Sequence, residues 1–180
     1  MSREAGLLGL YWPARPAPLE ACARRVYETF RTLQSLGYVP SYYFKGRSRR
    51  AALKRPFEVT EENVLATLAK GVNHTDVPRR TIPDLGWSLS LWSGGPDGEA
   101  YSLAITCGGY SAYVGNNVTL SLPPAGPFSL GVSPQPALKA YEALVGIWQP
   151  EQAVLCEGPI SWADGRLVPA REPLARYPPP

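Results

Sequence analysis

The amino-acid sequence predicts an α+β domain in which an antiparallel β-sheet of about four to six strands packs against two or three helices. Three observations lead to this prediction. Three segments, near residues 19–36, 61–70 and 134–148, carry apolar residues at helical spacing. Three runs between residues 87 and 122 alternate apolar with small polar residues, as half-buried strands do. The order strand, helices, strands, helix, strand is typical of the α+β class.

The first expected strand covers residues 7–12 and ends before Pro13. A helix follows over residues 19–36, because Val26, Phe30 and Leu33 fall on one face. Gly37 is placed to end this helix, since glycine is favoured just after a helix C-terminus.

Residues 38–56 are irregular and include six basic residues within the eleven positions 45–55. A second helix is expected over residues 61–70, with Thr60 as its N-cap. Two glutamates in its first turn face the positive end of the helix dipole.

Three strands are expected over residues 87–92, 101–107 and 118–122. Each has an apolar face and a face of small residues, mostly serine and threonine. This second face is predicted to be solvated or to be covered by a helix that packs close.

Ser133 and Pro134 predict the start of a third helix, which ends at Gln149-Pro150, and a short strand follows at residues 154–155. We expect residues 1–165 to form a single domain. Residues 166–180 are expected to form a proline-rich C-terminal extension, whose tail from residue 169 onward is expected to be poorly ordered.

The 180 residues suit one cytoplasmic domain. No apolar run reaches the length of a membrane span, and the N-terminal run is too short for a signal peptide. The three cysteines are far apart, as expected for buried, reduced thiols. Their spacing matches no zinc motif, so we expect no metal and no cofactor.

The sequence offers little for catalysis, and we expect the protein not to be an enzyme. The single histidine, His74, is expected in an exposed turn, although Asp76 could support it as a general base. No nucleophile motif accompanies it. A small hydrolase that uses His74 or a pair of carboxylates stays open as an alternative.

The basic run at residues 45–55 has three interpretations: a solvated loop, a protein contact, or a nucleic-acid contact with Tyr42, Tyr43 and Phe44 stacking on bases. Residues 1–56 carry eleven basic and three acidic side chains, whereas residues 57–180 carry seven and twelve. Because most of the chain is acidic, nucleic acid is the less favoured partner, and a nucleic-acid-binding accessory domain is the alternative function.

Several short strings, read in order between residues 8 and 158, resemble the immunity protein 52 family of bacterial polymorphic toxin systems. The strings are Tyr11-Trp12-x-x-Arg15, Glu20-x-Cys22-Ala23, Gly46-Arg47-Ser48-Arg49, Leu85-Gly86-x-Ser88-Leu89-x-Leu91-Trp92-x-Gly94, Cys107-Gly108, Asn116-Asn117, Leu120-x-Leu122-Pro123 and Trp148-x-Pro150.

The resemblance implies a cytoplasmic immunity protein that neutralises a cognate antibacterial toxin by direct stoichiometric binding. Toxins of this family are often nucleases of restriction-endonuclease-like fold, delivered by systems such as type VI secretion. The resemblance therefore implies a toxin protein as partner and no membrane contact, and it leaves the oligomeric state open.

Some motif residues adjoin periodic apolar segments or strand ends, and we expect them to be structural. These are Trp12, Arg15, Gly86, Leu91, Trp92, Gly94, Gly108, Asn117, Pro123, Trp148 and Pro150. Toxin contacts are expected instead from loops that carry arginine, tyrosine or acidic side chains. The candidates are Arg47, Arg49, Arg50, Asp76, Asp97, Glu99, Tyr110 and Tyr113.

Overall fold

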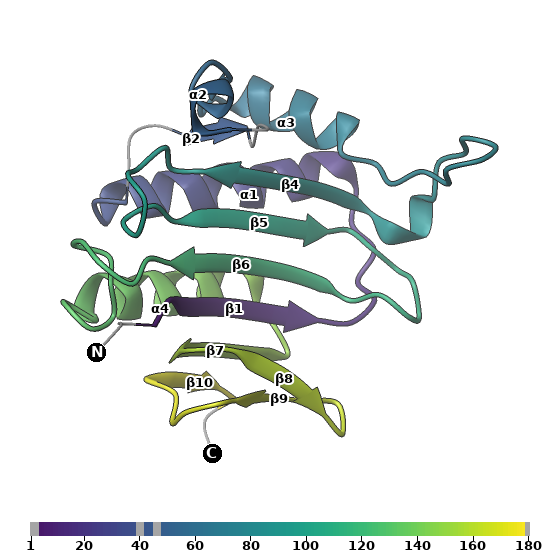
Figure 1. Cartoon of the computed structure of the whole chain (residues 1–180). Helices are drawn as coiled ribbons and strands as arrows, with labels where there is room; N and C mark the ends of the chain where they lie inside the picture. Colours follow the sequence, from purple (N-terminus) through teal and green to yellow (C-terminus); the bar gives the residue numbers. More distant parts are fainter. Residues whose placement is uncertain (1–3, 39–41, 45–47, 179–180) are drawn as a thin grey trace.

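The computed structural model describes residues 4–38, 42–44 and 48–178 and shows an α+β fold built on one large antiparallel sheet (Figure 1). The eight strands of this sheet lie in the order β10-β7-β1-β6-β5-β4-β2-β3. Their bounds are β1 Gly6–Trp12, β2 Tyr42–Phe44, β3 Pro56–Phe57, β4 Trp87–Trp92, β5 Ser102–Cys107, β6 Asn116–Leu122, β7 Gln152–Glu157 and β10 Ala175–Tyr177. A separate hairpin joins β8 Ile160–Ala163 to β9 Arg166–Pro169.

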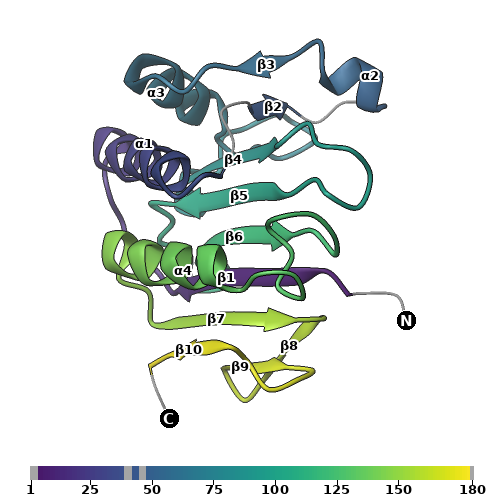
Figure 2. The ribbon, with the colours of Figure 1, turned by 90° about the vertical axis from the view of Figure 1, so that its left-hand side faces the viewer.

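The helices of the described chain are α1 Leu19–Ser35, α2 Arg49–Ala52, α3 Glu61–Lys70 and α4 Gln135–Trp148, with a 3₁₀ turn at Pro83–Leu85. Figure 2 shows α1, α3 and α4 together on one side of the sheet. The apolar residues of the alternating strands point to that side, and they form one core with the buried faces of the three helices. The opposite face of the sheet is turned to the viewer in Figure 1, and none of the described helices covers β1, β5 or β6 on that side.

Strand β1 lies in the middle of the sheet, between β6 and β7. Leu8 is paired with Leu120 on one side and with Leu155 on the other. All three leucines are buried in the helix-covered core. The N-terminal strand is therefore held by two segments that lie more than a hundred residues further along the chain.

Trp148, at the end of α4, ties the helix layer to β1. Its ring stacks on Trp12 with the ring centroids 5.3 Å apart, and its Nε1–H donates to Thr29 Oγ1 at 2.9 Å. The Arg15 guanidinium donates to the carbonyl oxygens of Trp148 and Gln149, both at 2.8 Å, and lies over the Trp12 ring. Arginine at this place satisfies backbone carbonyls that the helix end leaves without a partner.

The α+β class and the antiparallel sheet are confirmed, but the expected number of four to six strands is wrong. Strands β2, β3 and β10 have only two or three residues each, too few for an alternation to be recognised in the sequence. The same reason applies to the four-residue helix α2, which lies in the stretch that was expected to be irregular.

The proline-rich segment after residue 165 forms ordered strands in the structure. Strand β9 closes the β8–β9 hairpin, and β10 pairs with β7 at the edge of the main sheet. The expected start of α4 also shifts by one residue, because Pro134 rather than Ser133 occupies the N-cap position and no side chain caps it. In the segment after residue 165, the prolines lie at the ends of short strands and do not prevent strand formation.

Four tyrosines have buried hydroxyls for which the described residues offer no hydrogen-bond partner: Tyr38, Tyr42, Tyr101 and Tyr141. The hydroxyls of Tyr42 and Tyr101 lie near each other without meeting hydrogen-bond geometry. Burial raises the pKa of Tyr42 and of Tyr141 to about 12, and it raises the pKa of the other two as well.

This burial predicts alkaline sensitivity. The folded state holds these phenol protons more tightly than the unfolded chain, so stability falls as the pH rises from about 10 to 12. A Tyr42→Phe variant should avoid roughly 2 kcal/mol of the fall that the wild type shows between about pH 8 and pH 12. Urea unfolding at both pH values measures this difference, and equal losses in the two proteins would contradict it.

Candidate functional site

On β1, β4, β5 and β6, the face of the sheet that points away from the helices carries uncharged side chains, most of them small. Each strand contributes every second residue to this face, and the register aligns these residues in rows across the strands. The rows read Gln152, Tyr11, Asn117, Thr106 and Ser88; then Val154, Gly9, Thr119, Ala104 and Ser90; then Cys156, Leu7, Ser121, Ser102 and Trp92. Strands β1, β4, β5 and β6 contain no Lys, Arg, Asp or Glu on either face.

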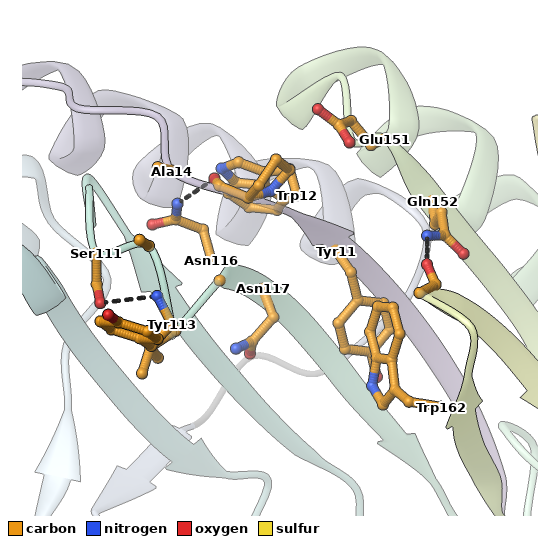
Figure 3. A pocket seen from close by; sticks show the side chains of 15 residues that line it. Tyr11, Trp12, Ala14, Ser111, Tyr113, Asn116, Asn117, Glu151, Gln152 and Trp162 are labelled. Atoms are coloured by element: carbon orange, nitrogen blue, oxygen red, sulfur yellow. Dashed lines mark hydrogen bonds between the residues drawn. The ribbon is translucent and has the colours of Figure 1, made fainter.

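A groove of about 680 Å³ opens at one end of this face, where β1 ends and β6 begins. Figure 3 shows Tyr11 and Trp162 on one side of the groove and Tyr113 on the other, with Asn117 between them. The lining is Tyr11, Trp12, Pro13, Ala14, Ser111, Ala112, Tyr113, Val114, Gly115, Asn116, Asn117, Glu151, Gln152, Trp162 and Gly165. Glu151 is the one charged residue of this lining.

The loop 108–115, which joins β5 to β6, forms one wall of the groove and is held by Asn116. The Asn116 side-chain NH₂ donates to the carbonyls of Pro13 at 2.8 Å and Gly109 at 3.0 Å, and Oδ1 accepts from the Gly109 N–H at 2.8 Å. Asn116 is buried, so these bonds are shielded from water. The amide thereby fixes the loop that presents Tyr113.

The opposite wall is formed by the β8–β9 hairpin. Trp162 of β8 meets the Tyr11 ring edge-on, with the centroids 5.4 Å apart. The Tyr11 ring lies over Gly9, where a Cβ atom would come within 2.6 Å of the ring, so glycine makes room for this arrangement. Burial, and secondarily the Cys156 thiol, raise the pKa of Tyr11, which keeps the phenol neutral.

The groove exposes large aromatic and apolar side chains to solvent. Tyr113 is 98% exposed, Trp162 is 54% exposed, and Val114 is also exposed. Tyrosine and tryptophan are enriched at protein interfaces, because they bury a large area and retain a polar group. A surface with exposed aromatic rims and a single charged residue, Glu151, is suited to contact another protein.

The residues that the sequence marked as contact candidates lie in several separate places. Tyr113 lines the groove, whereas Tyr110 of the same loop lines a second, shallow hollow beside Pro16 and Pro18. Asp97 and Glu99 are exposed in the loop between β4 and β5, at the opposite end of those strands.

The basic candidates belong to the segment around α2. Arg49 donates to the carbonyls of Gly94 and Gly95 and so links α2 to the loop between β4 and β5. Arg50 is exposed. Arg47 lies outside the described residues.

Two of the three aromatic residues that precede the basic run, Tyr42 and Phe44, are packed against the fold. Tyr42 is buried in the core, where its ring meets Phe30. Phe44 packs edge-on against Phe57, and the Arg55 guanidinium lies over the Phe44 ring. Of the three aromatic residues, Tyr43 is left half-exposed, with its ring centroid 6.3 Å from that of Trp92.

His74 and Asp76 lie in an exposed hairpin-like segment between α3 and β4, which projects from the domain in Figure 1. Within this segment, the Thr75 N–H donates to the Arg80 carbonyl, and the Arg80 N–H donates to the Thr75 hydroxyl. Over residues 4–38, 42–44 and 48–178, no three His, Cys, Asp or Glu side chains are grouped so as to hold a metal ion. In the same ranges, no helix has the length and apolar character to cross a membrane.

Tyr11, Val114 and Trp162 were not predicted from the sequence as contact residues. The polar alternation of the strands did indicate an open or closely covered face. The ring contact between Tyr11 and Trp162 depends on the β8–β9 hairpin, and no local sequence pattern predicts this hairpin. The sequence signal that could have identified Trp162 is a tryptophan beside the turn-forming residues Asp164 and Gly165, in a segment without helical period.

Comparison with known proteins gives one family match. The sequence model of immunity protein 52 matches residues 4–159 of the chain. No curated protein sequence matches. Among solved structures, a T6SS protein of Pseudomonas aeruginosa has a TM-score of 0.41 at 13% sequence identity, covering 84% of this chain. The aligned region is 41% of that structure, so this chain spans about two fifths of its length.

Proposed function

The chain belongs to the immunity protein 52 family, and on that premise we propose that it neutralises a cognate antibacterial toxin by binding it directly and stoichiometrically. The family match over residues 4–159 is the observation that carries this proposal. An immunity role requires affinity for a toxin, and an exposed surface of tyrosine, tryptophan and small uncharged residues can supply it. We propose that the protein acts in the cytoplasm, by binding and not by catalysis.

A nuclease of restriction-endonuclease-like fold is the proposed toxin, in keeping with the family. Such a toxin would be inhibited in a complex of standard size, which buries about 1,200–2,000 Å². Inhibition either covers the active site or acts away from it. The proposal requires only that the complex be stable and that its toxin be inactive.

Co-expression tests the proposal directly. The toxin encoded beside this chain should stop growth when expressed alone, and this chain should restore growth and co-purify with it in a one-to-one complex. A catalytically inactive toxin variant provides the sample for affinity measurements. If this chain neither restores growth nor co-purifies with the toxin, the proposed function is wrong.

The groove predicts which aromatic residues hold the toxin. Tyr113→Ala and Trp162→Ala should each weaken binding about 30-fold or more, because exposed aromatic anchors dominate many interfaces. Tyr110→Ala is the matched comparison, since Tyr110 comes from the same loop and lines the other hollow. Isothermal titration with the inactive toxin measures the three affinities. A larger effect at Tyr110 would place the contact on the opposite side of the loop.

A further inference from the structure

Residues 73–82, between α3 and β4, form an arm that projects from one end of the sheet (Figure 1). The Ile82 N–H donates to the Asn73 carbonyl at 2.8 Å, and this bond joins the two sides of the arm together with the bonds between Thr75 and Arg80. Eight consecutive residues of the arm are exposed. The arm therefore adds nothing to the hydrophobic core of the domain.

The base of the arm is fixed to β4. The Ser88 N–H and hydroxyl both donate to the Gly71 carbonyl, at 3.0 and 3.1 Å, and Val72 forms a β-bridge with Trp87. A Cβ atom on Gly71 would overlap the Ser88 carbonyl oxygen, so glycine is required for this close approach. An arm held in this way is ordered before a partner arrives, which lowers the entropic cost of binding.

The side chains of the arm combine an apolar tip with two basic groups. Val77, at the tip, is 91% exposed, and Pro78 follows it. Arg79 and Arg80 come next, and neither guanidinium forms an ion pair with any described residue. Guanidinium groups bind carboxylates and phosphates through paired N–H donors. Two such groups beside an exposed valine are therefore available to a partner.

The arm and the groove lie at the same end of the sheet. The Ser111 N–H, in the loop 108–115, donates to the carbonyl of Asp84, just beyond the arm, at 2.9 Å. Ile82 and Tyr113 are each two residues from this bond, and two residues span at most about 7 Å, so the base of the arm lies within roughly 20 Å of Tyr113. One partner's share of a standard interface, about 800 Å², is roughly 30 Å across and can include both.

We infer, on the basis of the proposed function, that the arm inserts its tip into a cleft of the toxin that is lined by carboxylates. A projecting arm buries most of its surface only where a partner surrounds it, so a cleft fits the arm better than a flat surface does. Inside such a cleft Val77 is removed from water, and Arg79 and Arg80 bond to carboxylates on the walls. The groove around Tyr113 then contacts the toxin beside the mouth of the cleft.

Nucleic acid suits the arm less well than a protein cleft does. The arginines at 79 and 80 and the aspartate at 76 give the arm a formal net charge of +1. Binding that depends on phosphates draws its affinity from several basic contacts. An apolar tip also gains more from burial in a protein than from a phosphate backbone.

Charge reversal in the arm tests the inference. An Arg79→Glu/Arg80→Glu variant should bind the inactive toxin at least about 100-fold more weakly than wild type, because two attractive contacts become repulsive. The matched control is Arg31→Glu/Lys139→Glu, which makes the same change of net charge at exposed positions of α1 and α4. Isothermal titration at about 0.15 M salt, where long-range effects are screened, should show the control within about threefold of wild type.

A second pair of variants tests the insertion of the tip. Val77→Asp should weaken binding at least about tenfold, because insertion would bury a charge among carboxylates. Val132→Asp is the control, since Val132 is 53% exposed in the loop between β6 and α4, and its affinity should equal that of wild type. Thermal unfolding confirms that all four variants are folded before their affinities are interpreted.

The outcomes separate the inference from the proposed function. If wild type binds the toxin and either arm variant binds within about threefold of it, the inference is overturned while the proposed function stands. If wild type does not bind the toxin, the proposed function itself fails. If wild type binds duplex DNA and Arg79→Glu/Arg80→Glu does not, nucleic acid is the partner of the arm and the inference is wrong.

Discussion

A Trp148→Ala variant should lose about 3–5 kcal/mol of the free energy of unfolding, the largest effect expected of any single substitution discussed for this protein. Trp148 is 1% exposed, and its ring stacks on Trp12. Truncation opens a cavity between α4 and β1 and removes the indole N–H that bonds to Thr29. A loss of this size is a large fraction of the free energy of unfolding of a typical domain, which is about 5–15 kcal/mol.

Two comparison variants separate the causes of this loss. Trp148→Phe keeps an aromatic ring on Trp12 but removes the N–H donor, so its loss should be about half as large. Trp162→Ala removes the same type of side chain from an exposed position and should cost about 1 kcal/mol or less. Urea unfolding at neutral pH measures all three. Equal losses at positions 148 and 162 would contradict the buried role of Trp148.

An Asn116→Leu variant should lose roughly 2–5 kcal/mol, even though leucine has a similar size and is apolar. The substitution leaves the buried Gly109 N–H and the Pro13 carbonyl without their partners, and each unsatisfied group costs about 1–3 kcal/mol. The Gly109 carbonyl is less affected, because it also accepts from the Arg15 N–H. The loop 108–115 should loosen, and toxin affinity should fall with it.

The neighbouring asparagine provides the control for this prediction. Asn117 is half-buried on the open face, where it lines the groove. Asn117→Leu should therefore change stability by less than about 1 kcal/mol. Hydrogen exchange reports the loop directly: amides of residues 108–115 should lose protection in Asn116→Leu and keep it in Asn117→Leu. The same protection in both variants would show that Asn116 does not hold the loop.

The regular elements could be predicted from the sequence because their patterns are local. Thr60 was expected to be the N-cap of α3, and the helix does begin after it. The Thr60 hydroxyl accepts a hydrogen bond from the Asn63 N–H. Strand β4 was expected over residues 87–92, and the structure has it there. All three cysteines are buried and free, as their number and spacing indicated.

The candidate site depends on contacts that no local pattern encodes. Tyr11 and Trp162 are 151 positions apart in the sequence and meet only because the β8–β9 hairpin turns back over β7. The open face could be anticipated as a polar alternation, but its lack of charge becomes meaningful only once the register aligns four strands. The contacts predicted from loops include Tyr113, which lines the groove, and do not include Tyr11 or Trp162, which line it as well.

The position of β1 in the sheet also determines when this protein can become active during its synthesis. One edge of this first strand cannot pair until residues 116–122 are made, and its other edge cannot pair until residues 152–157 are made. Contacts between such distant segments make folding slow, because a long loop must close before they form. A nascent chain that stops before residue 152 lacks β7, β8 and one side of the groove. Under the proposed function, toxin binding in the groove should therefore require synthesis at least through the β8–β9 hairpin.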